Sequence, residues 1–168
     1  DGGGGDGPNL ALLLTLLQPY SDGPVVVAER YDEGGWAAVD AAFQNPPQTT
    51  EQVIHVTDET PSPVQFTDRA RNGWRTFPGQ GVDGADVAGE ASMFVMFWNQ
   101  ARTTDARTLD PSVLGRTSSK FDIYNYDAPP SDGWDGDRLV PYRHPTGEDE
   151  YGYVWVTQWD TEQDAREF

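Results

Sequence analysis

The chain has 168 residues, a length typical of one domain, and its 28 acidic and 11 basic residues give a formal net charge of −17 at pH 7. This charge repels nucleic acid and anionic lipid surfaces, so we expect neither as a partner. The chain contains no cysteine, which excludes disulfides and thiolate metal sites.

The residue types that carry the charge bear on which class of acidic protein this is. Aspartate predominates among the acidic residues, and Lys120 is the one lysine. One interpretation is an ordinary acidic protein or a Ca²⁺ binder. The other is a protein adapted to molar salt, where the Debye length is about 3 Å and self-repulsion is screened. The scarcity of lysine favours the salt-adapted protein.

The N-terminal region combines a glycine-rich and a leucine-rich segment. Residues 1–7 have the composition of a flexible linker, which indicates a fragment of a longer chain. The segment Leu10–Leu17 predicts a helix that begins near Pro8, ends at Pro19 and is buried on all sides, because it has no polar face. It is too short to cross a bilayer, so we expect no membrane-spanning segment.

This leucine helix needs a covering surface. Fully burying one leucine is worth roughly 1.5–3 kcal/mol, so exposing two or three would offset much of a domain's stability. We expect Leu13 or Leu17 to contact the apolar segment Met93–Trp98. A residual apolar patch is expected to bind the upstream half of the same polypeptide or a second copy of the chain.

Two helical segments follow. The first runs from Ser21 or Gly23 to about Glu33, although its three consecutive valines mildly favour a strand. The pair Gly34-Gly35 ends it. Apolar residues at helical spacing then predict a short amphipathic helix over residues 36–43.

A stop signal and a start signal come next. Pro46 and Pro47 end the preceding helix, since proline lacks the N–H that a helix interior needs. Thr49 and Gln52 have the spacing of a capping box, which predicts a helix over residues 50–55.

The middle of the chain is rich in loops, with short strands predicted at Val64–Thr67 and Phe121–Tyr126. Between them, Asp86 is the expected cap of a helix over residues 87–101. That helix contains the sequence MFVMFW, which is apolar on nearly all sides. We therefore expect it at the centre of the core.

The C-terminal region predicts a β-hairpin. Residues 137–144 and 151–159 form its two strands, joined by the loop Pro145–Glu150. Alternation places five side chains of the second strand on one face, which we interpret as a core face rather than a sugar-stacking platform: Tyr151, Tyr153, Trp155, Thr157 and Trp159.

Asp160, with Gln163 at the box position, is the expected cap of a final helix over residues 161–168. The predicted fold class is α+β. It has a helical N-terminal half, a central buried helix, and a C-terminal antiparallel β-hairpin and final helix. All of these elements belong to one domain, residues 8–168.

Glu51 and His55 are the first candidate metal ligands. They lie four residues apart, so both project from one face of the predicted helix. A catalytic zinc needs about three protein ligands, and His144 is the one other histidine. Glu51 also lies in the first helical turn, where a carboxylate interacts favourably with the helix dipole. We interpret the pair as structural, with His55 hydrogen-bonded to nearby backbone.

Asp132, Asp135 and Asp137 are weak candidates for a Ca²⁺ site, because their spacing misses the EF-hand pattern. No nucleophile motif accompanies the serines. We therefore predict no catalytic residue and no metal site in this chain.

Residues 19–55 and 133–168 resemble haloarchaeal surface proteins and related bacterial secreted lipoproteins. The shared pattern runs from PYSDG through a Gly-Gly-Trp helix and Pro-Pro to TTEQVIH, and GEASMF at 89–94 also matches. The chain departs from the family at Val56, where the family usually has proline. The expected structural motif comprises Gly35, Trp36, Pro46, Pro47, Thr49, Glu51, Gln52 and His55.

In that family an upstream helix carries a zincin-like His-Glu-x-x-His motif. The resemblance therefore implies that this chain is the C-terminal module of a secreted, salt-adapted cell-surface protein and supports an upstream metal-binding half. Zinc would then belong to the full-length protein, and its location would be extracellular. The alternative is a non-enzymatic structural or adhesive surface protein that self-assembles. Whether the full-length protein is metallopeptidase-like stays open.

Overall fold

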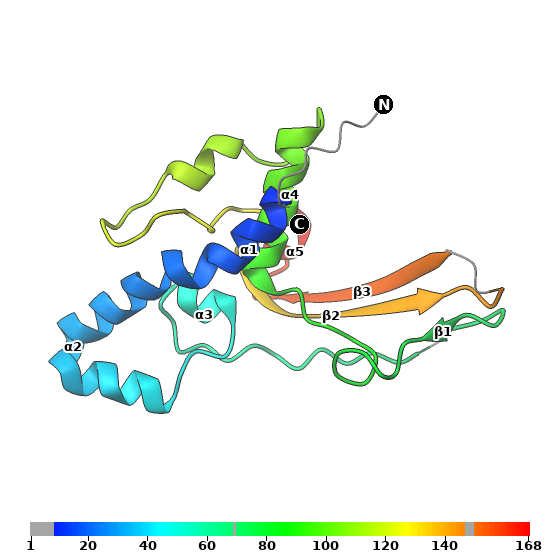
Figure 1. Ribbon diagram of the computed structural model, residues 1–168, viewed down its shortest axis with the longest axis horizontal. Coiled ribbons are helices and arrows are strands. Elements are labelled where there is room, and N and C mark those ends of the chain that lie inside the picture. Colours follow the sequence, from blue (N-terminus) through cyan, green and yellow to red (C-terminus); the bar gives the residue numbers. More distant parts are fainter. Residues whose placement is uncertain (1–8, 69, 147–149) are drawn as a thin grey trace.

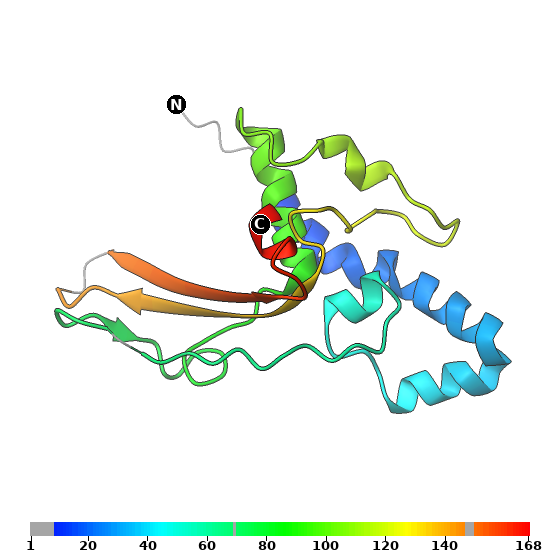
Figure 2. The same cartoon turned by 180° about the vertical axis from the view of Figure 1, so that it is seen from behind.

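The computed structural model describes residues 9–68, 70–146 and 150–168. Its helices and three-stranded antiparallel sheet confirm the predicted α+β class. The helices gather at one end, and the β-hairpin extends from them as a long arm, so the molecule is elongated (Figures 1 and 2). The predicted linker at 1–7, and Pro8, lie outside the described residues.

Helix α1 spans Leu10–Ser21 and begins at Asn9, whose side chain accepts hydrogen bonds from two backbone N–H groups of the first turn. The prediction that Pro19 ends this helix is wrong. Proline removes one backbone hydrogen bond, but the next turn still closes because the Asp22 N–H donates to the Gln18 carbonyl at 3.0 Å.

Helix α2 spans Gly23–Gln44 and is kinked where it was predicted to break. Gly34 departs from helical geometry, and Gly35 has a φ of 63°, a conformation that a residue without a Cβ adopts readily. The consecutive valines are helical, so the alternative of a strand there is wrong. The helix ends before Pro46, as expected.

Together, α1 and α2 form a helical stretch, Leu10–Gln44, that is long and apolar enough to cross a membrane by length and composition alone. Its most apolar 18-residue window has a mean hydropathy of 1.3 and is 22% buried. A core helix of a soluble protein and a signal sequence pass the same test, so the expectation of no membrane-spanning segment stays a prediction.

Helix α3, Thr50–Ile54, begins with the predicted capping box, and both of its hydrogen bonds between Thr49 and Gln52 form. Helix α4, Gly89–Thr103, lies within two residues of its predicted bounds. The Thr50 hydroxyl accepts a hydrogen bond from the Ala91 N–H at 3.2 Å, which ties the start of α3 to the start of α4. A short 3-10 helix, η1, follows at Pro111–Gly115.

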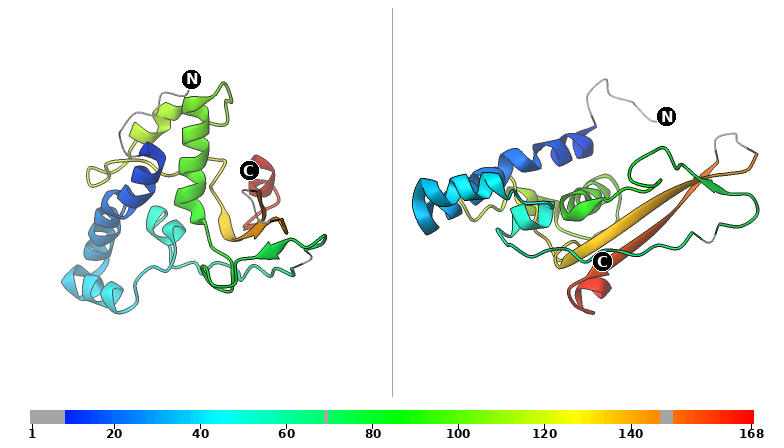
Figure 3. Two further views of the ribbon diagram at one scale, coloured as in Figure 1. Left: turned by 45° about the vertical axis from the view of Figure 1, so that its right-hand side comes forward. Right: turned by 90° about the horizontal axis from the view of Figure 1, so that it is seen from below.

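The sheet has the order β1-β2-β3, with β1 at Arg75–Thr76, β2 at Trp134–Arg143 and β3 at Tyr151–Trp159. The two long strands form the predicted antiparallel hairpin (Figure 3). Strands predicted at Val64–Thr67 and Phe121–Tyr126 are absent from the part of the chain that the structure describes. The second segment is instead held by isolated hydrogen bonds. Ser21 Oγ, for example, accepts the N–H groups of Ile123 and Tyr124.

The core forms where α1 crosses α4. Leu14 packs against buried residues of α4 and the loop that follows η1, namely Ala91, Phe94, Val95, Trp98, Tyr126 and Ala128. The Tyr126 hydroxyl donates to the Leu14 carbonyl at 2.7 Å. The predicted contact between the two helices therefore exists, but Leu14 rather than Leu13 or Leu17 makes it. Burial of α1 on all sides is wrong, since Leu12 and Leu16 are more than 60% exposed.

The aromatic face of β3 is only partly a core face. Tyr151 and Tyr153, near the end of the arm, are 66% and 71% exposed. Trp155 and Trp159, nearer the helices, pack against Phe168 at ring-centroid distances of 5.6 and 4.9 Å. The final helix α5, Asp164–Glu167, begins later than expected, because Thr161 rather than Asp160 exchanges hydrogen bonds with Asp164.

Candidate functional site

Asp137 of β2 lies buried at the N-terminus of α4. Its carboxylate accepts hydrogen bonds from the Ala88 and Gly89 N–H groups, both at 2.9 Å. It also accepts the indole N–H groups of Trp134 at 3.1 Å and Trp155 at 2.9 Å. Four donors and a helix N-terminus stabilise this negative charge. A side chain distant in sequence thus caps α4, whereas the predicted cap was Asp86.

Asp132, Asp135 and Asp137, the candidate Ca²⁺ ligands, have separate roles. Asp135 accepts hydrogen bonds from the Ser62 N–H at 2.7 Å and the Gln158 side chain at 2.9 Å. Asp137 is occupied by its four donors, and Asp132 faces α3. The structure therefore does not gather these three carboxylates into one cation site.

His55, at the C-terminal end of α3, contacts a buried carboxylate rather than backbone. Its Nε2 lies 2.9 Å from Oε1 of Glu90, a fully buried residue of α4. The hydrogen bond to Glu90 raises the pKa of His55 to about 9, because it favours the charged imidazolium. Burial raises the pKa of Glu90, and His55 opposes that shift. The pair joins α3 to α4, in agreement with a structural role.

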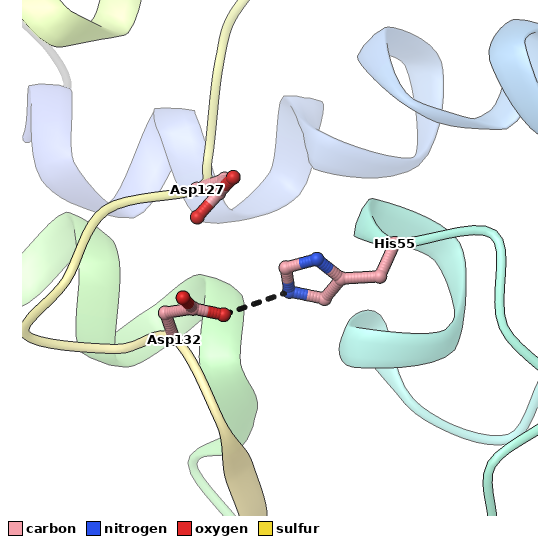
Figure 4. A group of neighbouring side chains, drawn as sticks. All are labelled: His55, Asp127 and Asp132. Carbon is pink, nitrogen blue, oxygen red and sulfur yellow. Dashed lines mark ion pairs between the residues drawn. The ribbon is translucent and has the colours of Figure 1, made fainter. Parts of the chain in front are cut away.

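Two further carboxylates face the same imidazole ring. His55, Asp127 and Asp132 each offer a ligand atom within 4.8 Å of the others, and His55 Nε2 lies 3.9 Å from Asp132 Oδ1 (Figure 4). A metal ligand must be a neutral imidazole, whereas the surrounding carboxylates favour the imidazolium. We interpret the protonated ring as the cation of this cluster.

Glu51 has different neighbours from His55, although both lie on α3. Its side chain, 4% exposed, lies beside Glu59 and Asp160, and the three carboxylates each place an oxygen within 4.8 Å of the others. Burial and then the charge of Glu90 raise the pKa of Glu51 to about 7. Its Oε2 atom is buried without a hydrogen-bond partner among the described residues.

The turn after α3 brings Glu59 back toward Glu51. Val56 ends the helix with a φ of 49°, a left-handed conformation that is costly for a β-branched residue. The Gln52 side chain then donates to the Glu59 carbonyl at 2.6 Å. Proline, with φ fixed near −65°, cannot adopt the backbone conformation of Val56 in this turn.

Four residues of these clusters were not predicted from the sequence as ligands or ion-pair partners: Glu59, Glu90, Asp127 and Asp160, of which Asp160 was expected only as a helix cap. One signal was available for Glu90, because a carboxylate in the first turn of a helix predicted to lie at the centre of the core must find a partner when that helix is buried. Asp22, which lies outside these clusters, is another buried carboxylate that was not predicted as a functional residue. Burial raises its pKa to about 7, and its Oδ2 accepts a hydrogen bond from the Gln18 amide at 2.8 Å.

Comparison with known proteins places the C-terminal part of the chain. Residues 75–168 match a family described as a domain of unknown function, DUF8575. No curated protein and no solved structure matches the chain significantly. The match includes Glu90, Asp137 and Asp160, whereas Glu51 and His55 precede it. Since the match spans more than half of the sequence, the chain belongs to the DUF8575 family.

Proposed function

We propose that this member of the DUF8575 family is a supporting module of a larger, salt-adapted cell-surface protein. It binds an upstream half of the same polypeptide through the exposed apolar side of α1 and α2. Any zinc of the complete protein then lies in that upstream half. The observation that carries the proposal is an apolar stripe along the two N-terminal helices.

The apolar stripe consists of side chains that are more than one third exposed: Leu12, Leu13, Leu16, Tyr20, Val27 and Tyr31. Spacings of four and seven residues place most of these side chains on one face of a helix. The opposite face of α1 carries the buried residues Leu14, Gln18 and Ser21, which contact the rest of the chain. Helix α1 thus buries one face against the rest of the domain and leaves an apolar face uncovered.

Energetics support a partner for the uncovered face. Leu16 and Tyr20 are 64% and 72% exposed, and α1 contains no charged residue. Burying one such side chain is worth roughly 1.5–3 kcal/mol. Contiguous apolar surface of this kind is typical of a protein–protein or membrane contact.

An apolar groove adjoins the stripe. Its volume is about 220 Å³, and it lies between the two halves of α2 and α3, lined in part by Val27, Val39, Phe43 and Pro47. Phe43, at its rim, is 77% exposed. The upstream half would fill this groove while it covers the stripe.

A second candidate function is self-assembly into a structural or adhesive surface layer. It is favoured by a separate aromatic surface at the opposite end of the molecule, where Tyr151 and Tyr153 are exposed. A hollow of about 520 Å³, lined in part by Trp74, Tyr142 and Tyr153, lies beside them. Two unlike surfaces at opposite ends suit head-to-tail contacts between copies.

Co-expression with the segment that precedes this chain in the encoded polypeptide tests the first function. We expect the two pieces to co-purify in molar NaCl, and the double variant Leu12→Ser, Leu16→Ser to lose the complex. Val82→Ser is the matched control, because Val82 is 73% exposed but lies outside the stripe. Absence of a complex, or a complex that the double variant keeps, contradicts the proposal.

Light scattering of the chain alone separates the two functions. A monomer across a range of concentrations agrees with the supporting module. Oligomers that grow with concentration and disappear in the Tyr151→Ser, Tyr153→Ser variant favour self-assembly.

Salt adaptation is tested by circular dichroism during dilution of NaCl. The net charge of −17 predicts loss of structure at low salt, since screening of the carboxylates is then removed. Full structure in about 10 mM salt, where the Debye length is near 30 Å, contradicts that part of the proposal.

A further inference from the structure

We propose that Glu51, Glu59 and Asp160 bind a hard divalent cation, with Ca²⁺ as the best fit. The site joins α3, the turn after it and the end of β3. It is distinct from the imidazole cluster around His55 and from the three aspartates that the sequence suggested. It goes beyond the proposed function and does not depend on it.

The geometry is that of a small oxygen cage. The three carboxylates come from separate points of the chain, yet each offers an oxygen within 4.8 Å of the other two. Glu51 is buried, whereas Glu59 and Asp160 are exposed. The site therefore has one ligand at its base and two at its mouth, so a cation can enter from solvent.

Glu51 supplies an observation that exposed acidic residues do not. Its Oε2 atom is buried and has no hydrogen-bond partner among the described residues. An unpaired buried carboxylate oxygen costs free energy, and a cation at this position would remove that cost. The same side chain offers an oxygen to the cluster, so this buried and incompletely hydrogen-bonded carboxylate belongs to the proposed ligand set.

The charges around the cluster also favour a bound cation. The pKa of Asp160 is raised by burial and then by the carboxylates of Glu59, Asp135, Asp164 and Asp132. The charges that raise the pKa of Glu51 are those of Glu90, Asp160 and Glu59, and His55 alone lowers it. His55, however, is hydrogen-bonded to Glu90. A divalent cation would supply the positive charge that this cluster lacks.

The donor set selects the kind of cation. Zinc sites in proteins usually include nitrogen or sulfur ligands, and this cluster offers carboxylate oxygens. Mg²⁺ requires near-ideal octahedral geometry, whereas Ca²⁺ accepts irregular sets of six to eight oxygens, including water. Three carboxylates on separate segments, open to solvent on one side, suit Ca²⁺.

The backbone beneath the ligands is already fixed. The Gln52 amide holds the Glu59 carbonyl at 2.6 Å, and Gln52 is itself a member of the capping box. The Asp160 N–H donates to the Gly133 carbonyl at 2.9 Å. Little ordering of the chain is therefore needed on binding, which favours affinity.

Calorimetric titration of the whole chain with CaCl₂, after treatment with a chelator and in molar NaCl, tests the proposal. We expect one Ca²⁺ per chain and a rise of roughly 3 °C or more in the melting midpoint at saturating Ca²⁺. The double variant Glu59→Gln, Asp160→Asn should lose both effects, with affinity at least tenfold weaker. Both residues are exposed, so this variant is expected to fold.

Glu51→Gln gives a second, opposite signature. Without Ca²⁺ it should melt at the same temperature as the wild type or higher, because it removes an unpaired buried charge; with Ca²⁺ it should melt lower than the wild type. Asp40→Asn, an exposed aspartate on α2, is the control for general screening of acidic surface and should keep the wild-type response. A wild type that binds no Ca²⁺, a response that the double variant keeps, or tight zinc without Ca²⁺ overturns the proposal.

Discussion

Two buried carboxylates, Asp137 and Glu51, lie near the same end of α4 but in opposite electrostatic settings. Asp137 accepts four hydrogen bonds and faces a helix N-terminus. Glu51 is surrounded by other carboxylates and keeps an unpaired oxygen. Burial alone therefore does not tell whether an acidic side chain stabilises this fold. The donors around it decide, and where donors are missing a bound cation can replace them.

Asp137→Ala should have the largest effect on stability. The change leaves two backbone N–H groups and two indole N–H groups without their acceptor, inside the junction of sheet and helices. We expect a loss of about 3–5 kcal/mol in the free energy of unfolding, measured by denaturant titration in molar NaCl.

Asp135→Ala is the matched control, since it removes a neighbouring carboxylate with two acceptor contacts at a less buried position. It should cost about 1 kcal/mol. Equal losses for the two variants would contradict the importance assigned to the four donors.

Leu14→Ala should cost about 2–4 kcal/mol, because Leu14 is 3% exposed in the core between α1 and α4. Leu16→Ala, two residues along the same helix, should change the unfolding free energy by less than about 0.5 kcal/mol in the isolated chain. Thermal melts of both variants check this. Similar losses would show that the apolar stripe is buried, for example by another copy of the chain.

The elements of the fold that local signals determine were predictable. Thr49 and Gln52 form a capping box through two short-range hydrogen bonds. The pair Gly34-Gly35 marks the kink in α2, where Gly35 adopts a positive φ that residues with a Cβ disfavour. The hairpin follows from alternation in β3. The prediction of a strand at Val64–Thr67 is wrong because Phe66 packs against Val140 and Tyr142 of the sheet while its segment forms no strand, and no local pattern distinguishes these two cases.

The candidate site was harder to predict, because its residues meet only through tertiary contacts. Glu51 lies on α3 and His55 is the residue that ends it, close to the prediction, but their side chains belong to different clusters. Asp160 reaches Glu51 across more than a hundred positions of sequence. In the sequence, Asp137 is one of three closely spaced aspartates with no feature that distinguishes it. Its role at the start of α4 depends on tertiary contacts.

His55 predicts a distinctive pH dependence. Its pKa is raised to about 9 in the folded chain from an ordinary value of 6.5. The contribution of the His55–Glu90 pair is therefore complete below about pH 6.5 and is lost as pH rises through about 9, a loss of about 1–2 kcal/mol after allowance for partial exposure. Denaturant titrations across this range should show the decline. His55→Gln, which does not titrate, should flatten it, and an unchanged profile in that variant would contradict the assignment.

Thr49→Ala should cost less than the variants of Asp137 and Leu14, about 1 kcal/mol, because one hydrogen bond of the capping box is lost while the Gln52 side chain keeps its contact with Glu59. Thr60→Ala is the control, an exposed threonine in the loop after α3. Equal melting temperatures of Thr49→Ala and Thr60→Ala would contradict a stabilising role of the capping box in α3.

The titration of Glu51 is the most direct test of the contrast between the two carboxylates. Carbon-detected NMR of glutamate-labelled protein, in chelator and molar NaCl, can follow its side-chain carboxyl, with Glu51→Gln identifying the signal. We expect the pKa of Glu51 to be raised to about 7 by burial and by the neighbouring carboxylates. Added Ca²⁺ should lower it. A pKa near the ordinary 4.5 without Ca²⁺ would contradict the account.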